Sequence, residues 1–217
     1  AKKPETAWQY NDSNKEIAFA HLVLGLLDPK RNKQEEFSQA SAAMRRYIDE
    51  DDNRYKPEQR MAYVFAGGRY RDASSMAKQP EDALFILDTA LEVVLRGIPL
   101  AKDKSELFLV IREIVNDKRK SLSKNEQERN ISLKKSLLIL EKKAKEIPSL
   151  GVLIADFYMQ LDETNTAKKW LINISREDDA NEEFCRAINV PDFFRLNLSY
   201  PGFALLAQKD PSWLIAY

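Results

Sequence analysis

The stretch LKKSLLILEKKAKEIP, residues 133–148, shows the pattern that decides the fold. Its apolar positions recur at alternating steps of four and three residues, which is the spacing of one face of an α-helix. These positions are Leu133, Leu137, Leu140, Ala144 and Ile147. Pro148 ends the run, because proline lacks the amide proton and its ring clashes with the preceding turn. The stretch therefore predicts a helix with a narrow packing seam, too short for a coiled coil of its own.

The same helical spacing runs through most of the chain. It predicts helices over residues 17–27, 34–48, 80–97, 107–115, 150–161 and 164–174, followed by short helices from residue 175 to the end. A helix through Met61 and Phe65 is expected to break at a glycine turn, Gly67-Gly68. Residues 116–130 are polar and form either a loop or the exposed ends of two helices. No alternating strand pattern appears, so the expected fold class is all-α, with roughly nine to eleven helices.

Residues 148–181 carry a more specific pattern of small and large side chains on two short helices. The positions concerned are Ile154, Ala155, Tyr158, Ala167 and Leu171. The small side chains let the two helices approach closely, and the large ones fill the space beside them. The segment resembles a tetratricopeptide repeat, a helix pair of about 34 residues, and residues 80–95 resemble the second helix of another. The resemblance implies an α-solenoid of stacked antiparallel hairpins, and an irregular helical bundle is the alternative.

Length and composition suit one all-α domain over residues 1–217. A subdivision into N-terminal helices (1–100) and tetratricopeptide-like helices with an aromatic C-terminal cap (101–217) is also consistent with the pattern. The 34 Lys and Arg balance 34 Asp and Glu, which argues against a generally basic nucleic-acid binder. The neutrality is a cancellation between basic residues 112–146 and acidic residues 151–192. Such polarity favours oriented docking in an assembly.

Two features of the chain bear on its compartment. No apolar run reaches the 18 or more residues, roughly, that a membrane span needs, so no span is predicted and a soluble protein is expected. The chain begins Ala1-Lys2-Lys3 without methionine, and a small residue is typical of the position that follows signal-peptide cleavage. This start favours an exported or periplasmic protein, with a cytoplasmic one as the alternative.

Few side chains could carry catalysis. His21 is the only histidine, and it lies on an apolar helix face with no carboxylate or nucleophile at a local spacing. Cys185 is expected to be a small buried hydrophobe. The acidic residues between 177 and 183 open a helix, where they stabilise its dipole. No enzymatic activity, metal or cofactor is therefore expected, and an enzyme or small-ligand site that uses His21 with an acid is the alternative.

A basic stretch over residues 118–135 raises a second alternative, a nucleic-acid accessory protein. Single strands are usually bound with aromatic side chains that stack on the bases, and no aromatic residue lies between Phe108 and Phe157. A solvated helix face explains the stretch better, so nucleic acid is not the expected partner.

The expected function is a non-enzymatic scaffold or assembly factor that binds a partner protein or peptide. Stacked hairpins build extended grooves, and in the family that the chain resembles the first helices of the pairs often line them. The predicted partner contacts on such helices are Arg69, Arg71, Asp156, Tyr158 and Gln160. The C-terminal aromatics Phe193, Phe194 and Trp213 either cap the stack or dock into a partner.

Overall fold

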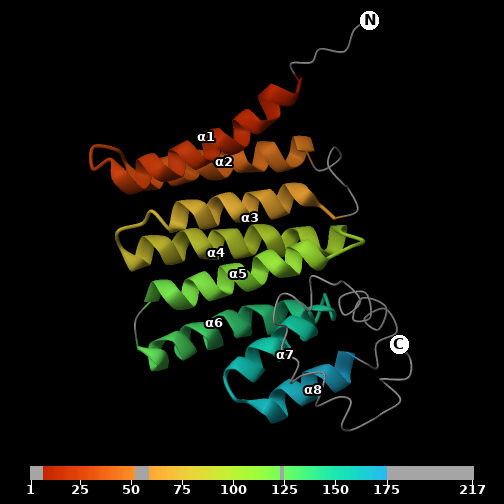
Figure 1. Cartoon of the computed structure of the whole chain (residues 1–217). Coiled ribbons are helices and arrows are strands. Elements are labelled where there is room, and N and C mark those ends of the chain that lie inside the picture. The colour runs from red at the N-terminus through yellow and green to blue at the C-terminus, as the bar shows by residue number, and fades with distance from the viewer. Residues whose placement is uncertain (1–6, 52–58, 123–124, 175–217) are drawn as a thin grey trace, which may run out of the picture.

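A computed structural model describes residues 7–51, 59–122 and 125–174, and these residues are all-α, as predicted. Their helices succeed one another from one end of the molecule to the other (Figure 1). They are α1 (Ala7–Leu27), α2 (Lys33–Asp51), α3 (Met61–Ser74), α4 (Pro80–Gly97), a 3-10 turn η1 (Ile98–Leu100), α5 (Ser105–Leu122), α6 (Glu126–Ala144), α7 (Leu150–Gln160) and α8 (Thr164–Ile174).

Local chemistry accounts for where several helices begin. Pro80 opens α4, where its missing amide proton is not needed, and Glu81 and Asp82 follow in the first turn. Asn125 caps α6, because its side-chain oxygen accepts a hydrogen bond of 2.9 Å from the amide of Gln127. Of the polar stretch 116–130, residues 116–122 end α5 and residues 126–130 begin α6, which fits the second of the two predicted possibilities except that Lys118 is buried.

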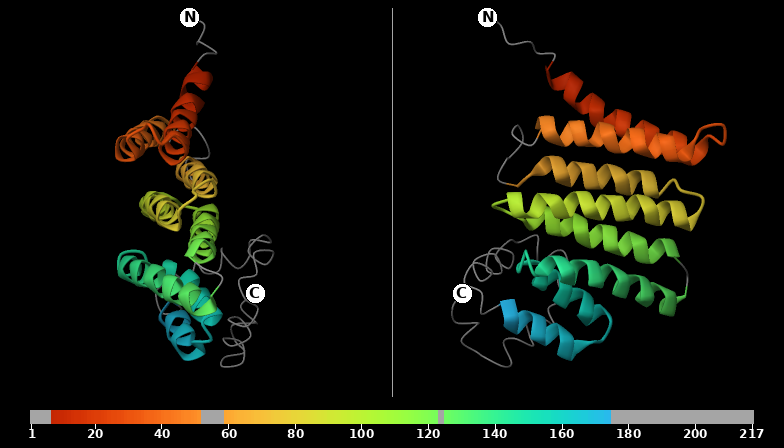
Figure 2. Two further views of the ribbon diagram at one scale, coloured as in Figure 1. Left: turned by 90° about the vertical axis from the view of Figure 1, so that its left-hand side faces the viewer. Right: turned by 180° about the vertical axis from the view of Figure 1, so that it is seen from behind.

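The helices lie in two ranks. Seen end-on, α1, α3 and α5 lie on one side of the molecule, and α2 and α4 lie on the other (Figure 2). Within the first rank α3 packs against both α1 and α5, and α5 reaches α7. Each helix also packs against its neighbour in the sequence, as in the pairs α1 with α2 and α3 with α4.

One hydrophobic core runs through the described helices from α1 to α7. The predicted apolar faces of residues 107–115 and 133–147 are buried in it, which confirms that the four-three spacing marked packed helix faces. The buried positions are Leu107, Val110, Ile111, Ile114, Val115, Leu133, Leu137, Leu140, Ala144 and Ile147. No helix in the described ranges is long and apolar enough to cross a membrane.

The predicted break at Gly67-Gly68 is wrong, since α3 continues through both glycines. Packing explains the difference. A Cβ on Gly67 would lie 2.6 Å from Cγ2 of Val94 and 2.7 Å from Cγ1 of Val110, so the missing side chain lets α3 approach α4 and α5. Glycine by itself predicts a turn, but Gly67 instead allows a close contact between helices.

Several features singled out in the sequence lie outside the described ranges. They are Ala1-Lys2-Lys3, the acidic residues between 177 and 183, Cys185, Phe193, Phe194 and Trp213. The short helices predicted after residue 175 lie outside them as well.

Candidate functional site

Two of the predicted partner contacts, Arg69 and Arg71, join α3 to both of its neighbours in the first rank. Arg69 Nη2 lies 2.5 Å from Oε1 of Glu16 on α1. Arg71 Nε donates to Oδ2 of Asp117 on α5 at 2.8 Å, and its Nη1 binds Glu113. Residues two apart on a helix point about 200° apart, which sends one arginine toward α1 and the other toward α5.

Burial and the carboxylate of Glu16 shift the pKa of Arg69 in opposite directions. Partial burial lowers the pKa of the guanidinium, and the hydrogen bonds and charges of Glu16 and Asp72 raise it by more, so the net shift is upward. The guanidinium also lies 5.4 Å from the ring centre of Phe19. Arg69 therefore stays charged and holds α1 against α3 through both a carboxylate and an aromatic face.

Two further predicted contacts, Asp156 and Gln160, join α7 to α5. Oδ2 of the buried Asp156 lies 3.3 Å from Arg112 Nη2 and accepts a hydrogen bond of 3.2 Å from Gln160 Nε2. Gln160 Oε1 in turn accepts one of 2.7 Å from Arg119. Together with the contacts of Arg69 and Arg71, these links run along the odd-numbered helices α1, α3, α5 and α7, and we call them the odd-helix ladder.

The fifth predicted contact, Tyr158, connects α7 to α6. Its hydroxyl donates a hydrogen bond of 2.5 Å to Oε1 of Glu141. Burial raises the pKa of the phenol, and Glu141 raises it further because the ionised phenolate would face a carboxylate. All five residues thus connect helices, and their role as partner contacts remains a prediction.

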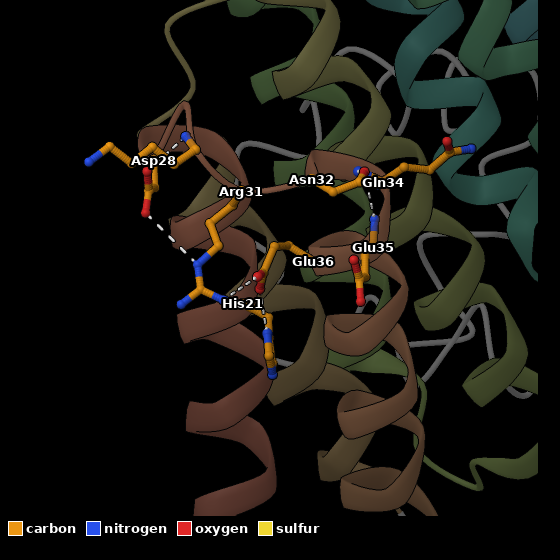
Figure 3. Close-up of polar contacts among 8 residues, drawn as sticks. His21, Asp28, Arg31, Asn32, Gln34, Glu35 and Glu36 are labelled. Carbon is orange, nitrogen blue, oxygen red and sulfur yellow. Dashed lines mark hydrogen bonds and ion pairs between the residues drawn. The ribbon is translucent and has the colours of Figure 1, made fainter.

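His21 has a partner in the structure that no sequence pattern predicted. His21 Nδ1 lies 2.6 Å from Oε2 of Glu36, across the α1–α2 hairpin, and the other oxygen of Glu36 lies 3.3 Å from Arg31 (Figure 3). Fifteen residues separate the pair, so neither helix alone contains a recognisable spacing. A carboxylate only accepts, so the proton of this hydrogen bond lies on Nδ1.

This geometry orients an imidazole as a general base requires. Catalysis would also need a nucleophile, a metal or a second reacting group. Glu36 is the one polar partner of His21 among the described residues, and within those ranges no group of three or more His, Cys, Asp and Glu side chains could hold a metal ion. The observed effect of the pair is to fasten α1 to α2.

A groove lies between the parallel helices α2 and α4, with α3 as its floor. At its closed end the rings of Phe37 and Phe85 stack 5.5 Å apart, and Lys33 Nζ lies 2.7 Å from Asp82. Beyond these contacts the two helices line an open cavity of about 340 Å³. We call it the α2–α4 groove, lined by Ser41, Met44, Arg45, Ile48, Asp49, Tyr63, Tyr70, Thr89, Glu92, Val93 and Arg96.

The floor and the rim of this groove differ in character. Met44 and Tyr70 at the floor are 1% and 2% exposed. Burial raises the pKa of the Tyr70 phenol, while a hydrogen bond with Ser41 and the charges of Arg96 and Arg45 oppose the rise. The groove therefore combines a buried floor with a rim that carries two arginines, Arg45 and Arg96, and two carboxylates, Asp49 and Glu92.

The sequence did not single out these groove residues. Arg45 and Arg96 lie 51 positions apart in the chain, and each reads as an ordinary exposed cation of an amphipathic helix. A signal was present in the matching helical steps: positions 37, 41, 45 and 48 on α2 correspond to 85, 89, 93 and 96 on α4. Only the parallel arrangement of the two helices turns these steps into one groove.

The basic stretch 118–135 is divided among the helices. Lys118 is buried, and its Nζ lies 2.5 Å from Asp88 of α4. Arg119 binds Gln160, and Lys134 lies 2.7 Å from Glu163. Several of its cations therefore serve contacts within the fold.

Comparison with known proteins adds no relative. No protein-family model, curated protein or solved structure matches the chain. The residues and their geometry therefore carry the functional conclusion.

Proposed function

We propose that the protein is a non-enzymatic scaffold that binds a segment of a partner protein in the α2–α4 groove. The observation that carries this proposal is the groove itself. Its two helices are in contact at one end, and beyond that contact they enclose a cavity over an apolar, aromatic floor. Its volume is at the lower end of the range of about 300–1,000 Å³ typical of ligand sites, which suits a few side chains of a peptide.

We further propose that the hairpins α1–α2, α3–α4, α5–α6 and α7–α8 are repeated units of a tetratricopeptide-like α-solenoid. The succession of helices in two ranks supports this architecture (Figure 2). In such a stack the second helices of neighbouring units lie parallel, and any gap between them is a groove. The partner site proposed here has second helices as its walls and the first helix α3 as its floor, whereas the contacts predicted from the sequence lie on first helices.

The test uses the full chain as bait and a matched pair of variants on α4. Glu92 lines the groove and Glu81 does not, and both are exposed. Glu92→Trp places an indole at the groove rim, while Glu81→Trp makes the same change elsewhere on the helix. We expect a partner that saturates wild-type and Glu81→Trp proteins and is lost from Glu92→Trp. Equal saturable binding to all three, or no saturable binding to any, would reject the groove as the partner site.

One observation supports an enzyme as the second candidate, namely the oriented His21–Glu36 pair. A hydrolysis screen with model esters and amides would compare the wild-type chain with His21→Ala. Any turnover that His21→Ala retains in full removes the motive for this candidate.

A further inference from the structure

Helix α6 carries a second row of regularly spaced residues on the side opposite its buried seam. The members of this row are all exposed, and they are Ile131, Lys135, Leu138, Lys142 and Lys145. Their steps of four and three residues repeat those of the buried seam, Leu133 to Ile147, two positions earlier in the chain. Two residues correspond to about 200° of rotation, so the row lies on the far side of the helix. We call it the α6 stripe.

The apolar members of the α6 stripe are unusually open to solvent. Leu138 is 65% exposed and Ile131 is 51% exposed, and Ile139 beside them is 41% exposed. On an amphipathic helix the side opposite the core is normally polar. Apolar residues scattered singly over a surface need no explanation, whereas three grouped on one helix face indicate a contact surface.

The charge along the α6 stripe is of one sign. Within the described part of the chain, its three lysines form no ion pair. The acids closest to them are engaged by other side chains, in the pairs Glu141 with Tyr158, Glu163 with Lys134 and Glu146 with Lys143. Exposed Glu126 and Glu128 precede the stripe, and the nearer one lies seven residues before Lys135, about 10 Å along the helix. The stripe therefore combines apolar surface with positive charge that the fold does not neutralise.

The spacing of the stripe fits another helix. Steps of four and three keep a row of residues facing a second helix that runs alongside at a small angle. A membrane surface would meet a broad apolar face, whereas lysines interrupt this one. A second copy of the chain would bring like charges together, because an antiparallel pair centred on Leu138 sets Lys135 of one copy against Lys142 of the other.

We propose that the α6 stripe binds an acidic amphipathic helix of a partner protein. Apolar residues of that helix pack on Ile131 and Leu138, and its Asp or Glu side chains pair with the three lysines. From Ile131 to Lys145 the stripe rises about 21 Å, so the partner contributes about four turns. None of its residues lines the α2–α4 groove, so this surface is separate from the site proposed above.

The probe is a display library of helices of about 21 residues, long enough to be helical, with randomised residues along one seam and its flanks. The immobilised full chain selects from it, and the enrichment at each position is counted. We expect Leu, Ile or Val at the seam. At the flanks Asp and Glu should be enriched over Asn and Gln by at least about threefold, the lower end for three exposed ion pairs. A second library with proline at its centre should yield no binders, because proline interrupts the helix.

Charge recognition is tested with two matched triple variants. Replacement of all three stripe lysines by Gln should bring the ratio of acids to amides to about one. The control removes the same charge from exposed lysines outside α6, as Lys30→Gln, Lys78→Gln and Lys102→Gln, and should keep the acid preference. Thermal midpoints and helical circular dichroism check that each variant is folded. An acid preference that survives loss of the stripe lysines overturns the proposal.

The apolar contact is tested with two exposed leucines. Leu138→Gln should lower the recovery of binders at least about fivefold, because it removes apolar area that the partner helix buries. Leu100→Gln makes the same change at a leucine that is 45% exposed and lies outside α6, and it should leave recovery unchanged. Equal recovery by both variants contradicts the proposed contact.

The remaining outcomes assign the stripe to another occupant or to none. No enrichment by the wild type, or equal recovery from the proline library, overturns a helical partner. Capture of anionic phospholipid vesicles or of an oligonucleotide in place of acidic helices does so as well. Acidic helices that bind only after Glu182→Gln and Glu183→Gln would show that the chain's own C-terminal residues occupy the stripe. Glu92→Trp should leave the selection unchanged, so failure at α6 does not touch the groove, and loss of binding in Glu92→Trp would overturn the assignment to α6.

Discussion

Gly67 and Gly68 provide a matched pair for testing how closely α3 packs against α4 and α5. The two residues are adjacent in one helix, so Gly→Ala at either position brings the same gain in helix propensity, about 1 kcal/mol. Their surroundings differ. A Cβ on Gly68 would meet nothing within 4 Å, whereas one on Gly67 would meet methyl groups of Val94 and Val110 at 2.6 and 2.7 Å.

The expected free energies follow from these distances. Carbon atoms in contact normally lie about 3.5–4.0 Å apart, so the Cβ on Gly67 overlaps each valine by roughly 1 Å. The two valines belong to different helices, α4 and α5, and α3 cannot move away from one without disturbing the other. Overpacking of this kind costs about 1–3 kcal/mol. Gly67→Ala should therefore lower the free energy of unfolding by about 1 kcal/mol net, and Gly68→Ala should raise it by about 1 kcal/mol.

Urea unfolding followed by helical circular dichroism measures both variants, with an unchanged m-value as the check that the transitions are comparable. For a chain of this size the two variants should differ in thermal midpoint by roughly 4–8 °C. A double variant, Gly67→Ala with Val94→Ala, should show favourable coupling because one overlapping methyl group is removed. Equal stabilisation by the two single substitutions would refute the close packing at Gly67.

Three other predictions concern single side chains. Arg71→Ala removes the ion pairs with two carboxylates on α5 and should lower the free energy of unfolding by about 1 kcal/mol. This loss should shrink in high salt. The control Arg46→Ala should leave the free energy of unfolding nearly unchanged. Ser136 is fully buried and its hydroxyl has no hydrogen-bond partner among the described residues, so Ser136→Ala should stabilise the protein by up to about 1 kcal/mol, a gain that chemical unfolding can measure. The raised pKa of Tyr158 favours the neutral phenol in the folded state, so its contribution to the free energy of unfolding is complete below the ordinary pKa of about 10 and is lost as the pH rises above it. A pH titration of unfolding should show that the wild type becomes less stable relative to Tyr158→Phe above about pH 10. Parallel curves would contradict this assignment.

Most of the fold could be predicted from helical periodicity, because the packing of one apolar face determines where helices lie. The helices predicted over 150–161 and 164–174 match α7 and α8 to within one residue. The seam that ends at Pro148 is buried as expected. Gly67-Gly68 was predicted wrongly, because the turn preference of glycine is a local property and its use here depends on helices elsewhere in the chain.

The candidate site was harder to predict, since its residues meet only across helices. The sequence around His21 does not indicate that Glu36 is its partner, because the two side chains meet only when α1 packs against α2. Arg69 and Arg71 were predicted to contact a partner from the first helices of the pairs, and that role remains a prediction. In the structure carboxylates on α1 and α5 engage them, and no spacing in α3 could have revealed this.

Because of the odd-helix ladder, the helices are joined differently on the two sides of the molecule. Its links are charged and polar contacts on one side of the stack, while the α2–α4 groove leaves a gap on the other. Because screening weakens charged links, added salt should loosen the contacts among the odd-numbered helices. A partner segment held in the α2–α4 groove as proposed would add contacts on the opposite side of the molecule. Ionic strength and partner binding should therefore change the helix spacing on opposite sides of the molecule.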